Sequence, residues 1–133
     1  MALIATAAIT GLFIPTKLSS SRSYTLPVLT PFDVLSDTST VAEKKLAISY
    51  IAKKYLIDER QLIKTIECES GFNNSRVGAA GELSWVQFMP GTWDAFKCEG
   101  EITNIKDSLT CMAISWQQKK QKHWSCWSKF FAS

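Results

Sequence analysis

The sequence has 133 residues, a formal net charge of +3 at pH 7 and 46% hydrophobic residues. A chain of this length holds at most one domain of ordinary size, and its hydrophobic content is sufficient for a packed core. The modest charge makes nucleic acid an unexpected partner. One histidine and four widely spaced cysteines match no metal-ligand pattern, so we expect neither a metal nor a cofactor, and we expect a monomer.

The N-terminal third predicts an apolar segment followed by a linker. Residues 1–16 are almost continuously apolar, too short for a membrane span and similar in length to a signal-peptide core. No Lys or Arg precedes this run and no small-residue cleavage site follows it, so membrane association through a short anchor stays open. Residues 17–40 are rich in Ser, Thr and Pro, as in linkers. We expect the folded domain to span residues 41–133.

The four cysteines bear on the compartment. Their even number indicates two disulfides and an oxidising environment, with three connectivities open among Cys68, Cys98, Cys111 and Cys126. Reduced, buried thiols are the alternative. Together with the apolar start, the cysteines favour a secreted or cell-envelope-associated protein. The lysine-rich residues from 117 onward are either a solvated face or a surface attracted to an anionic polymer or membrane.

The domain is predicted to begin with two helices. The first, over residues 41–56, is amphipathic, with an apolar stripe that comprises Leu46, Ala47, Tyr50, Ile51 and Leu56. Asp58 is a suitable N-cap for a second helix over residues 59–70, and Gly71 is a suitable C-cap.

The second half is predicted to be helical after an irregular segment. Residues 73–89 contain several turn-forming residues and predict a loop or a short irregular hairpin. Pro90 favours the start of another helix, and residues 104–121 predict a last long one. A tryptophan-rich tail follows. The expected fold class is therefore mainly α, with one irregular insertion after the second helix.

Two glutamates near the end of the second helix differ in direction. Glu67 and Glu69 are about 200° apart around a helix, so one cleft cannot hold both. Glu69 lies beside the apolar stripe of Leu62 and Ile66, where desolvation and the C-terminal end of the helix dipole raise a carboxyl pKa. This predicts a general acid, unless Glu69 only caps a turn or pairs with a lysine. Cys68 points the opposite way and is interpreted as half of a disulfide that anchors the helix from behind.

Two motifs follow one another from this helix end. They are "ESGFN" over residues 69–73 and "GAAGELSWVQFMPGTW" over residues 78–93. Their matching residues are Glu69, Ser70, Gly71, Phe72, Asn73, Gly78, Gly81, Gln87, Phe88, Met89, Pro90 and Thr92. In this order after an amphipathic helix, the pair resembles the lytic transglycosylase and goose-type lysozyme-like superfamily. The resemblance covers about residues 41–127.

The resemblance implies a lysozyme-like helical fold and an enzyme that cleaves peptidoglycan glycan strands. The bond would be the β-1,4 linkage between N-acetylmuramic acid and N-acetylglucosamine. Glu69 would be the single catalytic acid and base, and the muramic 6-hydroxyl would attack the anomeric carbon to give a 1,6-anhydro product. Ser70 and Gln87 would support the cleft and bind glycan.

Other readings of these residues stay open. Glu82 is a second acid, a substrate contact or a solvated loop residue, and as a second acid it would favour a hydrolytic muramidase. Trp85 and Phe88 line sugar subsites or pack in the core. A catalytically inactive glycan-binding module is the remaining alternative. Ser84 replaces the glycine usual in the second motif, so we expect the backbone at this position not to be left-handed.

Overall fold

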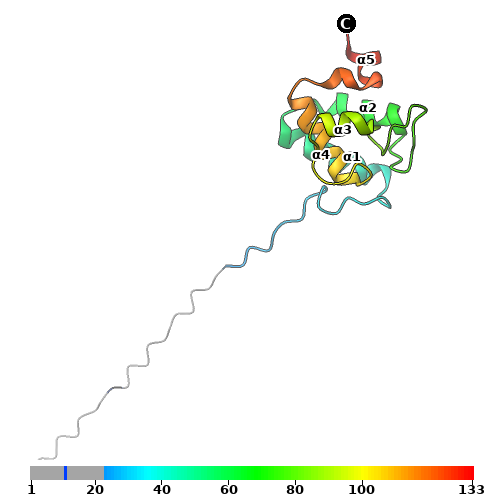
Figure 1. Cartoon of the computed structure of the whole chain (residues 1–133). Helices are drawn as coiled ribbons and strands as arrows, with labels where there is room; N and C mark the ends of the chain where they lie inside the picture. Colours follow the sequence, from blue (N-terminus) through cyan, green and yellow to red (C-terminus); the bar gives the residue numbers. More distant parts are fainter. Residues whose placement is uncertain (1–10, 12–22) are drawn as a thin grey trace, which may run out of the picture.

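The computed structural model describes Gly11 and residues 23–133, and this part of the chain is mainly helical (Figure 1). The helical elements are α1 (Val41–Tyr55), α2 (Glu59–Ser70), α3 (Pro90–Ala95), α4 (Ile105–Gln117), the 3-10 turn η1 (Gln121–His123) and α5 (Ser125–Phe131). The described residues form no strand, only isolated bridges from Leu83 to Val77 and to Phe88. The predicted mainly α class and the irregular segment before Pro90 are confirmed.

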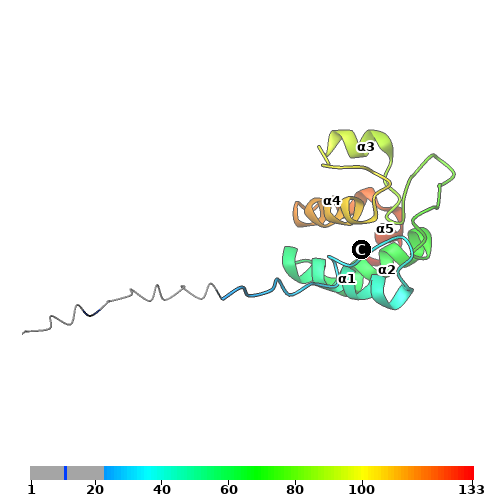
Figure 2. The ribbon, with the colours of Figure 1, turned by 90° about the horizontal axis from the view of Figure 1, so that it is seen from below.

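The helices pack around one core. α1 contacts both α2 and α4, and α5 packs on α2. In Figure 2, α1 and α2 occupy one side of the body, and α4 lies between them and α3. The largest fully buried side chains include Trp85, Trp116, Phe88, Ile48, Ile51, Leu62, Ile66, Leu109 and Met112.

The ends of α2 follow from its sequence. The side chain of Asp58 accepts a hydrogen bond of 2.9 Å from the N–H of Gln61, which satisfies one of the unpaired N–H groups at the helix start. Gly71 ends the helix with a left-handed φ of 60°, and its N–H donates to the carbonyl of Glu67. Both predicted caps are confirmed, and they place Glu69 in the last turn.

The buried face of α1 differs from the predicted stripe. Leu46 is 59% exposed and Leu56 is 89% exposed, whereas Ala47, Ile48, Ile51 and Ala52 are buried. Leu56 lies beyond the last helical residue, in a left-handed C-cap conformation. Lys44 is buried instead, and its Nζ donates a hydrogen bond of 2.9 Å to the carbonyl of Phe72. Burial of this lysine is tolerated because its ammonium group donates a hydrogen bond to this carbonyl at the turn after α2.

Two disulfides connect the helices. Cys68 of α2 is bonded to Cys126 of α5, and Cys98 is bonded to Cys111 of α4. The predicted pair of disulfides is confirmed, and the structure resolves their connectivity. Such bonds are typical of proteins from oxidising compartments.

The chain before α1 has two parts within the described residues. Residues 23–29 lead away from the helical body (Figure 1). From Thr30 onward the chain turns onto that body: Leu35 is buried, and the Nζ of Lys106 donates to the carbonyl of Asp33 at 2.6 Å. The packed structure therefore starts before Val41, because an apolar side chain of the expected linker enters the core.

The predicted apolar segment over residues 1–16 lies outside the described residues, apart from Gly11, as does the linker up to residue 22. In the part of the chain that is described, no helix has the length and apolarity needed to cross a membrane.

Candidate active site

Glu69 lines a small depression where three separate segments meet. The depression has a volume of about 140 Å³ and is formed by the end of α2, the loop leading into α3 with the start of that helix, and the η1–α5 segment. Its lining residues are Glu69, Glu82, Gln87, Phe88, Met89, Thr92, His123, Trp124 and Ser125. Four of the six predicted site residues, Glu69, Glu82, Gln87 and Phe88, therefore lie together, and the tail, which is distant in the sequence, completes the lining.

The surroundings of the Glu69 carboxyl favour its protonated form. Glu69 is half-buried, and its Oε1 accepts a hydrogen bond of 3.1 Å from the backbone N–H of Cys126. Burial is the main cause that raises the pKa of Glu69 above its ordinary value of 4.5. The N–H of Cys126 acts against this, the negative charge of Glu82 adds to it, and Arg76 and the Ser125 hydroxyl oppose it.

On α2, the position of Glu67 agrees with the prediction from helix geometry, whereas that of the Cys68 disulfide does not. Glu67 is exposed and does not line the depression. Cys68 forms a disulfide, as interpreted from the sequence, but this bond does not anchor the helix from behind. Its partner is Cys126, whose N–H donates to Glu69. The disulfide lies beside the carboxyl because α5 packs on α2 next to the depression.

Gln87 lines the depression, and hydrogen bonds of its amide nitrogen orient its side chain. Its Nε2 donates to the carbonyls of Arg76 at 3.0 Å and Ser84 at 2.6 Å, which identifies the nitrogen and the oxygen of the amide. Within the described residues, Oε1 accepts no hydrogen bond. This oxygen lies against Gly78, where an added Cβ would be 2.8 Å away. Gln87 is thus held by its nitrogen, and its oxygen remains as an acceptor.

Glu82 is folded back onto its own loop. Its Oε2 accepts a hydrogen bond of 3.0 Å from the N–H of Ala80, and an added Cβ on Gly78 would lie 2.0 Å from the same atom. The backbone carbonyl of Glu82 also accepts from the N–H of Gly78 at 2.8 Å. Glycine at position 78 is therefore required for the Glu82 and Gln87 side chains to lie together at the depression.

Ser70 and Trp85 lie outside the depression and join the helix end to the core. The hydroxyl of Ser70 donates to the carbonyl of Trp85. Trp85 is fully buried, and its Nε1 donates to the carbonyl of Ile105 at 3.1 Å and to Ser108 Oγ at 3.0 Å. In this conformation neither side chain lines the depression with Glu69.

Phe88 lines the depression but belongs mainly to the aromatic core. It is 1% exposed, and its ring packs edge-on against Trp93 and Trp124 at centroid distances of 5.3 and 5.1 Å. Trp93 is also buried. Packing in the core therefore describes Phe88 better than a sugar-stacking surface does.

The backbone of Ser84 differs from the expectation. Its φ is 68°, in the left-handed region, although a serine replaces the usual glycine. The turn is held by Gln87, whose N–H and side-chain amide both donate to the Ser84 carbonyl, at 3.2 and 2.6 Å. Within the described residues the buried Ser84 hydroxyl has no hydrogen-bond partner.

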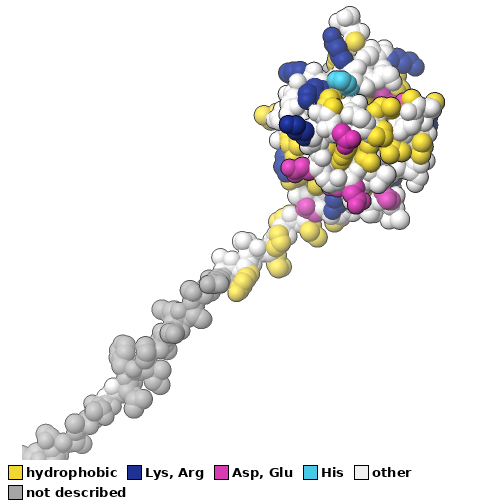
Figure 3. Space-filling view, viewed as in Figure 1, with side chains coloured by type: hydrophobic (Ala, Val, Ile, Leu, Met, Phe, Trp, Pro, Cys, Tyr) yellow, Lys and Arg dark blue, Asp and Glu magenta, His cyan; other side chains and the backbone are white. Residues whose placement is uncertain are grey.

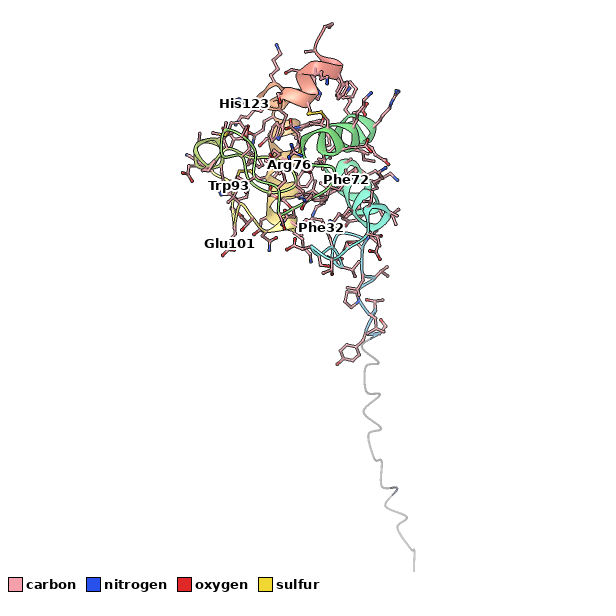
Figure 4. All side chains as sticks on the ribbon, turned by 90° about the vertical axis from the view of Figure 1, so that its right-hand side faces the viewer. Phe32, Phe72, Arg76, Trp93, Glu101 and His123 are labelled. Carbon is pink, nitrogen blue, oxygen red and sulfur yellow. A yellow bond between two sulfur atoms is a disulfide. The ribbon has the colours of Figure 1, made fainter. Side chains whose placement is uncertain are left out.

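The tail forms one wall of the site, which sequence reasoning missed. Trp124 is buried, and its Nε1 donates to the carbonyl of Val86 at 2.8 Å. The ring of His123 packs edge-on against Phe96 at 4.8 Å. In Figure 3, His123 (cyan) lies on the visible face near several Lys and Arg side chains, and Figure 4 shows it next to α5. A disulfide from Cys68 to the tail is the sequence feature that could have placed the tail at the site, but the sequence leaves that pairing open.

A larger depression of about 450 Å³ lies near the Cys98–Cys111 disulfide. The carboxylate of Asp107 in its lining already accepts a hydrogen bond of 2.9 Å from the N–H of Glu101. Among the described residues, no group of three or more His, Cys, Asp or Glu side chains is placed to hold a metal ion. The half-buried Glu69 is therefore the strongest candidate for chemistry.

Comparisons with protein families, with curated proteins and with solved structures give no match to this chain. The interpretation of the site therefore depends on its own residues, contacts and electrostatics.

Proposed function

We propose that the protein cleaves the glycan strands of peptidoglycan as a lytic transglycosylase with a lysozyme-like fold. Its target is the β-1,4 bond between N-acetylmuramic acid and N-acetylglucosamine, and Glu69 is its acid and base. The observation that carries the proposal is a half-buried carboxyl with a raised pKa that lines a surface depression. Perturbed carboxyl groups of this kind occur preferentially at catalytic sites.

The proposed reaction needs one protein carboxyl. Protonated Glu69 donates its proton to the glycosidic oxygen as the bond to the muramic anomeric carbon breaks. The Glu69 carboxylate then takes a proton from the muramic 6-hydroxyl, whose oxygen bonds to the anomeric carbon. The products are a 1,6-anhydromuramic end and a free 4-hydroxyl on N-acetylglucosamine. Glu69 returns to its protonated form.

The contacts of Glu69 suit both steps. Burial stabilises the neutral acid that the first step uses, and the N–H of Cys126 stabilises the carboxylate that the second step uses. These two influences oppose each other on one group, and burial is the larger of them. A single carboxyl can therefore act first as acid and then as base.

The shape of the site suits a polymer. A volume of about 140 Å³ is below the roughly 300–1,000 Å³ of pockets that enclose a small ligand. A glycan strand would cross the surface with only the bond to be cleaved above Glu69. Gln87 Oε1 would accept a hydrogen bond from a sugar hydroxyl or an acetamido N–H.

A hydrolytic muramidase is the second candidate, because Glu82 lines the same depression and affects the pKa of Glu69. An inverting hydrolase activates water with a second carboxylate about 6.5–9.5 Å from the acid. The hydrogen bond from Ala80 to Glu82 favours the transglycosylase, since it holds this carboxylate on its own loop. Anhydromuramic ends in the products support the transglycosylase, and reducing muramic ends support the hydrolase.

The test is mass spectrometry of muropeptides after digestion of purified peptidoglycan by the wild-type protein, Glu69→Gln and Glu67→Gln. Glu67 is the matched control because it is an exposed carboxyl on the same helix. We expect cleavage by the wild type and by Glu67→Gln, and a loss of at least about a hundredfold in Glu69→Gln. Cleavage that survives Glu69→Gln contradicts the assignment. Glycan binding by a wild type that cuts nothing supports a binding module.

The same proposal implies a location for the protein. Peptidoglycan lies outside the cytoplasmic membrane, so the protein would be secreted or associated with the cell envelope. The two disulfides support an oxidising compartment. The partner would be the glycan strand, bound by a monomer.

A further inference from the structure

Cys126 makes two connections between α5 and the end of α2. The Sγ of Cys126 is bonded to Cys68, and its backbone N–H donates to Glu69 Oε1 at 3.1 Å. Cys68 and Glu69 are consecutive in the sequence. The covalent bond therefore constrains the distance across which the hydrogen bond forms.

The residues on either side of Cys126 make contacts that do not involve the disulfide. Trp124 is 3% exposed, and its Nε1 donates to the carbonyl of Val86 at 2.8 Å. The Nε1 of Trp127 donates to Gln61 Oε1 at 2.9 Å. These contacts keep the segment over Glu69 and maintain the burial of its carboxyl. Neither contact involves the Cys126 N–H, which donates instead to Glu69 Oε1, since the side chain of Trp124 does not cap α5.

We propose that Cys126 is a positioning residue for Glu69, and that the Cys68–Cys126 disulfide holds the Cys126 N–H on the carboxylate. The role of Glu69 in cleavage rests on the proposed function, whereas the positioning itself is a property of the folded protein. The disulfide is thus part of the site, and the Cys98–Cys111 bond, which lies elsewhere, is not.

Breaking the Cys68–Cys126 bond has a defined electrostatic consequence. The hydrogen bond from Cys126 stabilises the carboxylate, so its weakening favours the protonated acid. Burial of Glu69 persists because Trp124 stays anchored. The other groups that line the site or affect the pKa of Glu69 are Glu82, Arg76, His123 and the Ser125 hydroxyl, and none of them is altered when the two cysteines are replaced or reduced. The pKa of Glu69 therefore rises further.

The test compares Cys68→Ser/Cys126→Ser with Cys98→Ser/Cys111→Ser by carbon-13 NMR titration of glutamate carboxyl groups, with Glu69→Gln used to assign the signal. We expect an upward shift of the Glu69 titration midpoint in the first variant only. An unchanged or lowered midpoint in the first variant overturns the proposal, as does an equal rise in both variants. This measurement needs no substrate, so it tests the positioning role of Cys126 even if the wild type cleaves no peptidoglycan.

Two further measurements keep both Cys68 and Cys126, so they do not require the Cys68→Ser/Cys126→Ser variant to fold. Dithiothreitol added to Cys98→Ser/Cys111→Ser reduces only the Cys68–Cys126 bond, and we expect the same shift, reversed on reoxidation. In the wild type, the Cys126 amide is expected to exchange with deuterium at least a hundredfold more slowly than an exposed amide. A fast-exchanging amide overturns the proposal.

Kinetics separate positioning from general structural support. If the protein cleaves glycan, loss of the Cys68–Cys126 bond should lower kcat about tenfold or more with KM unchanged, because the acid is misplaced but substrate binding is not. The pH optimum should move upward with the pKa of Glu69. Equal effects on KM and kcat in both double variants contradict a positioning role.

Discussion

Glu69 and Cys126 are 57 residues apart in the sequence, yet the N–H of Cys126 donates a hydrogen bond of 3.1 Å to Glu69 Oε1. A carboxylate usually gains stability from such a bond, which lowers its pKa. Here burial outweighs that effect, and the pKa of Glu69 is raised. Ionisation of Glu69 therefore has a free-energy cost for folding, because the charged carboxyl is less favourable in the folded protein than in the unfolded chain.

This cost predicts that Glu69→Gln is more stable than the wild type at neutral pH. Above the unfolded-state pKa of about 4.5, the native protein binds more protons at Glu69 than the unfolded chain does. The contribution of Glu69 to stability is therefore complete below that pH and is lost as the pH rises through the raised native pKa. Glutamine stays neutral and avoids the loss.

Urea unfolding at pH 7 and pH 4 checks this, with Glu67→Gln as the exposed control. The stability gain of Glu69→Gln should be present at pH 7 and should shrink at pH 4. A gain of the same size at both pH values would contradict the linkage to Glu69 ionisation.

Gly78→Ala is expected to disturb the depression and to destabilise the protein by less than about 1 kcal/mol, because both clashing atoms end flexible side chains. The added Cβ would lie 2.0 Å from Glu82 Oε2 and 2.8 Å from Gln87 Oε1, so one of these side chains must move. Thermal unfolding and the cleavage assay would both show the change. Gly91→Ala is the control, because nothing lies within 4 Å of its added Cβ. Because Gly91 lies in α3, its replacement by alanine should leave the free energy of unfolding unchanged or raise it by up to about 1 kcal/mol.

Local rules predicted the elements whose causes are local. Asp58 caps α2 with its own side chain, Gly71 takes the left-handed φ that ends it, and Pro90 begins α3. The different directions of Glu67 and Glu69 followed from helical geometry alone. Each of these features depends on residues within one turn, so the sequence was sufficient to identify them.

Features that depend on distant partners could not be predicted in the same way. Lys44 is buried because the carbonyl of Phe72 receives its ammonium group, and hydrophobic periodicity contains no such information. Trp85 was assigned to a sugar subsite or the core, and only the fold shows its indole N–H bonded to Ile105 and Ser108. The tail joined the site through one of three cysteine pairings, which spacing does not distinguish.

Ser84→Gly is expected to stabilise the protein by about 1 kcal/mol, because a left-handed φ of 68° costs a residue with a Cβ but not glycine. The substitution also removes a buried hydroxyl that has no partner among the described residues. Ser84→Ala separates the two causes, since it removes the hydroxyl and keeps the Cβ. Chemical denaturation should give a larger gain for glycine than for alanine. Equal gains would mean that the backbone conformation carries no strain.

Lys44→Met is expected to destabilise the protein by about 1–3 kcal/mol, because the carbonyl of Phe72 would lose its 2.9 Å hydrogen bond inside the protein. Methionine keeps most of the buried aliphatic length, so the loss reports mainly on the ammonium group. Phe72 has a left-handed φ of 63° directly after Gly71, and Lys44 is the side chain that holds its carbonyl. Weakening this turn should therefore also loosen the end of α2 and lower cleavage.

Lys53→Met, at an exposed position of the same helix, should change stability by less than about 0.5 kcal/mol. If both substitutions cost the same in urea unfolding, the Lys44 contact does not stabilise the turn that follows Glu69.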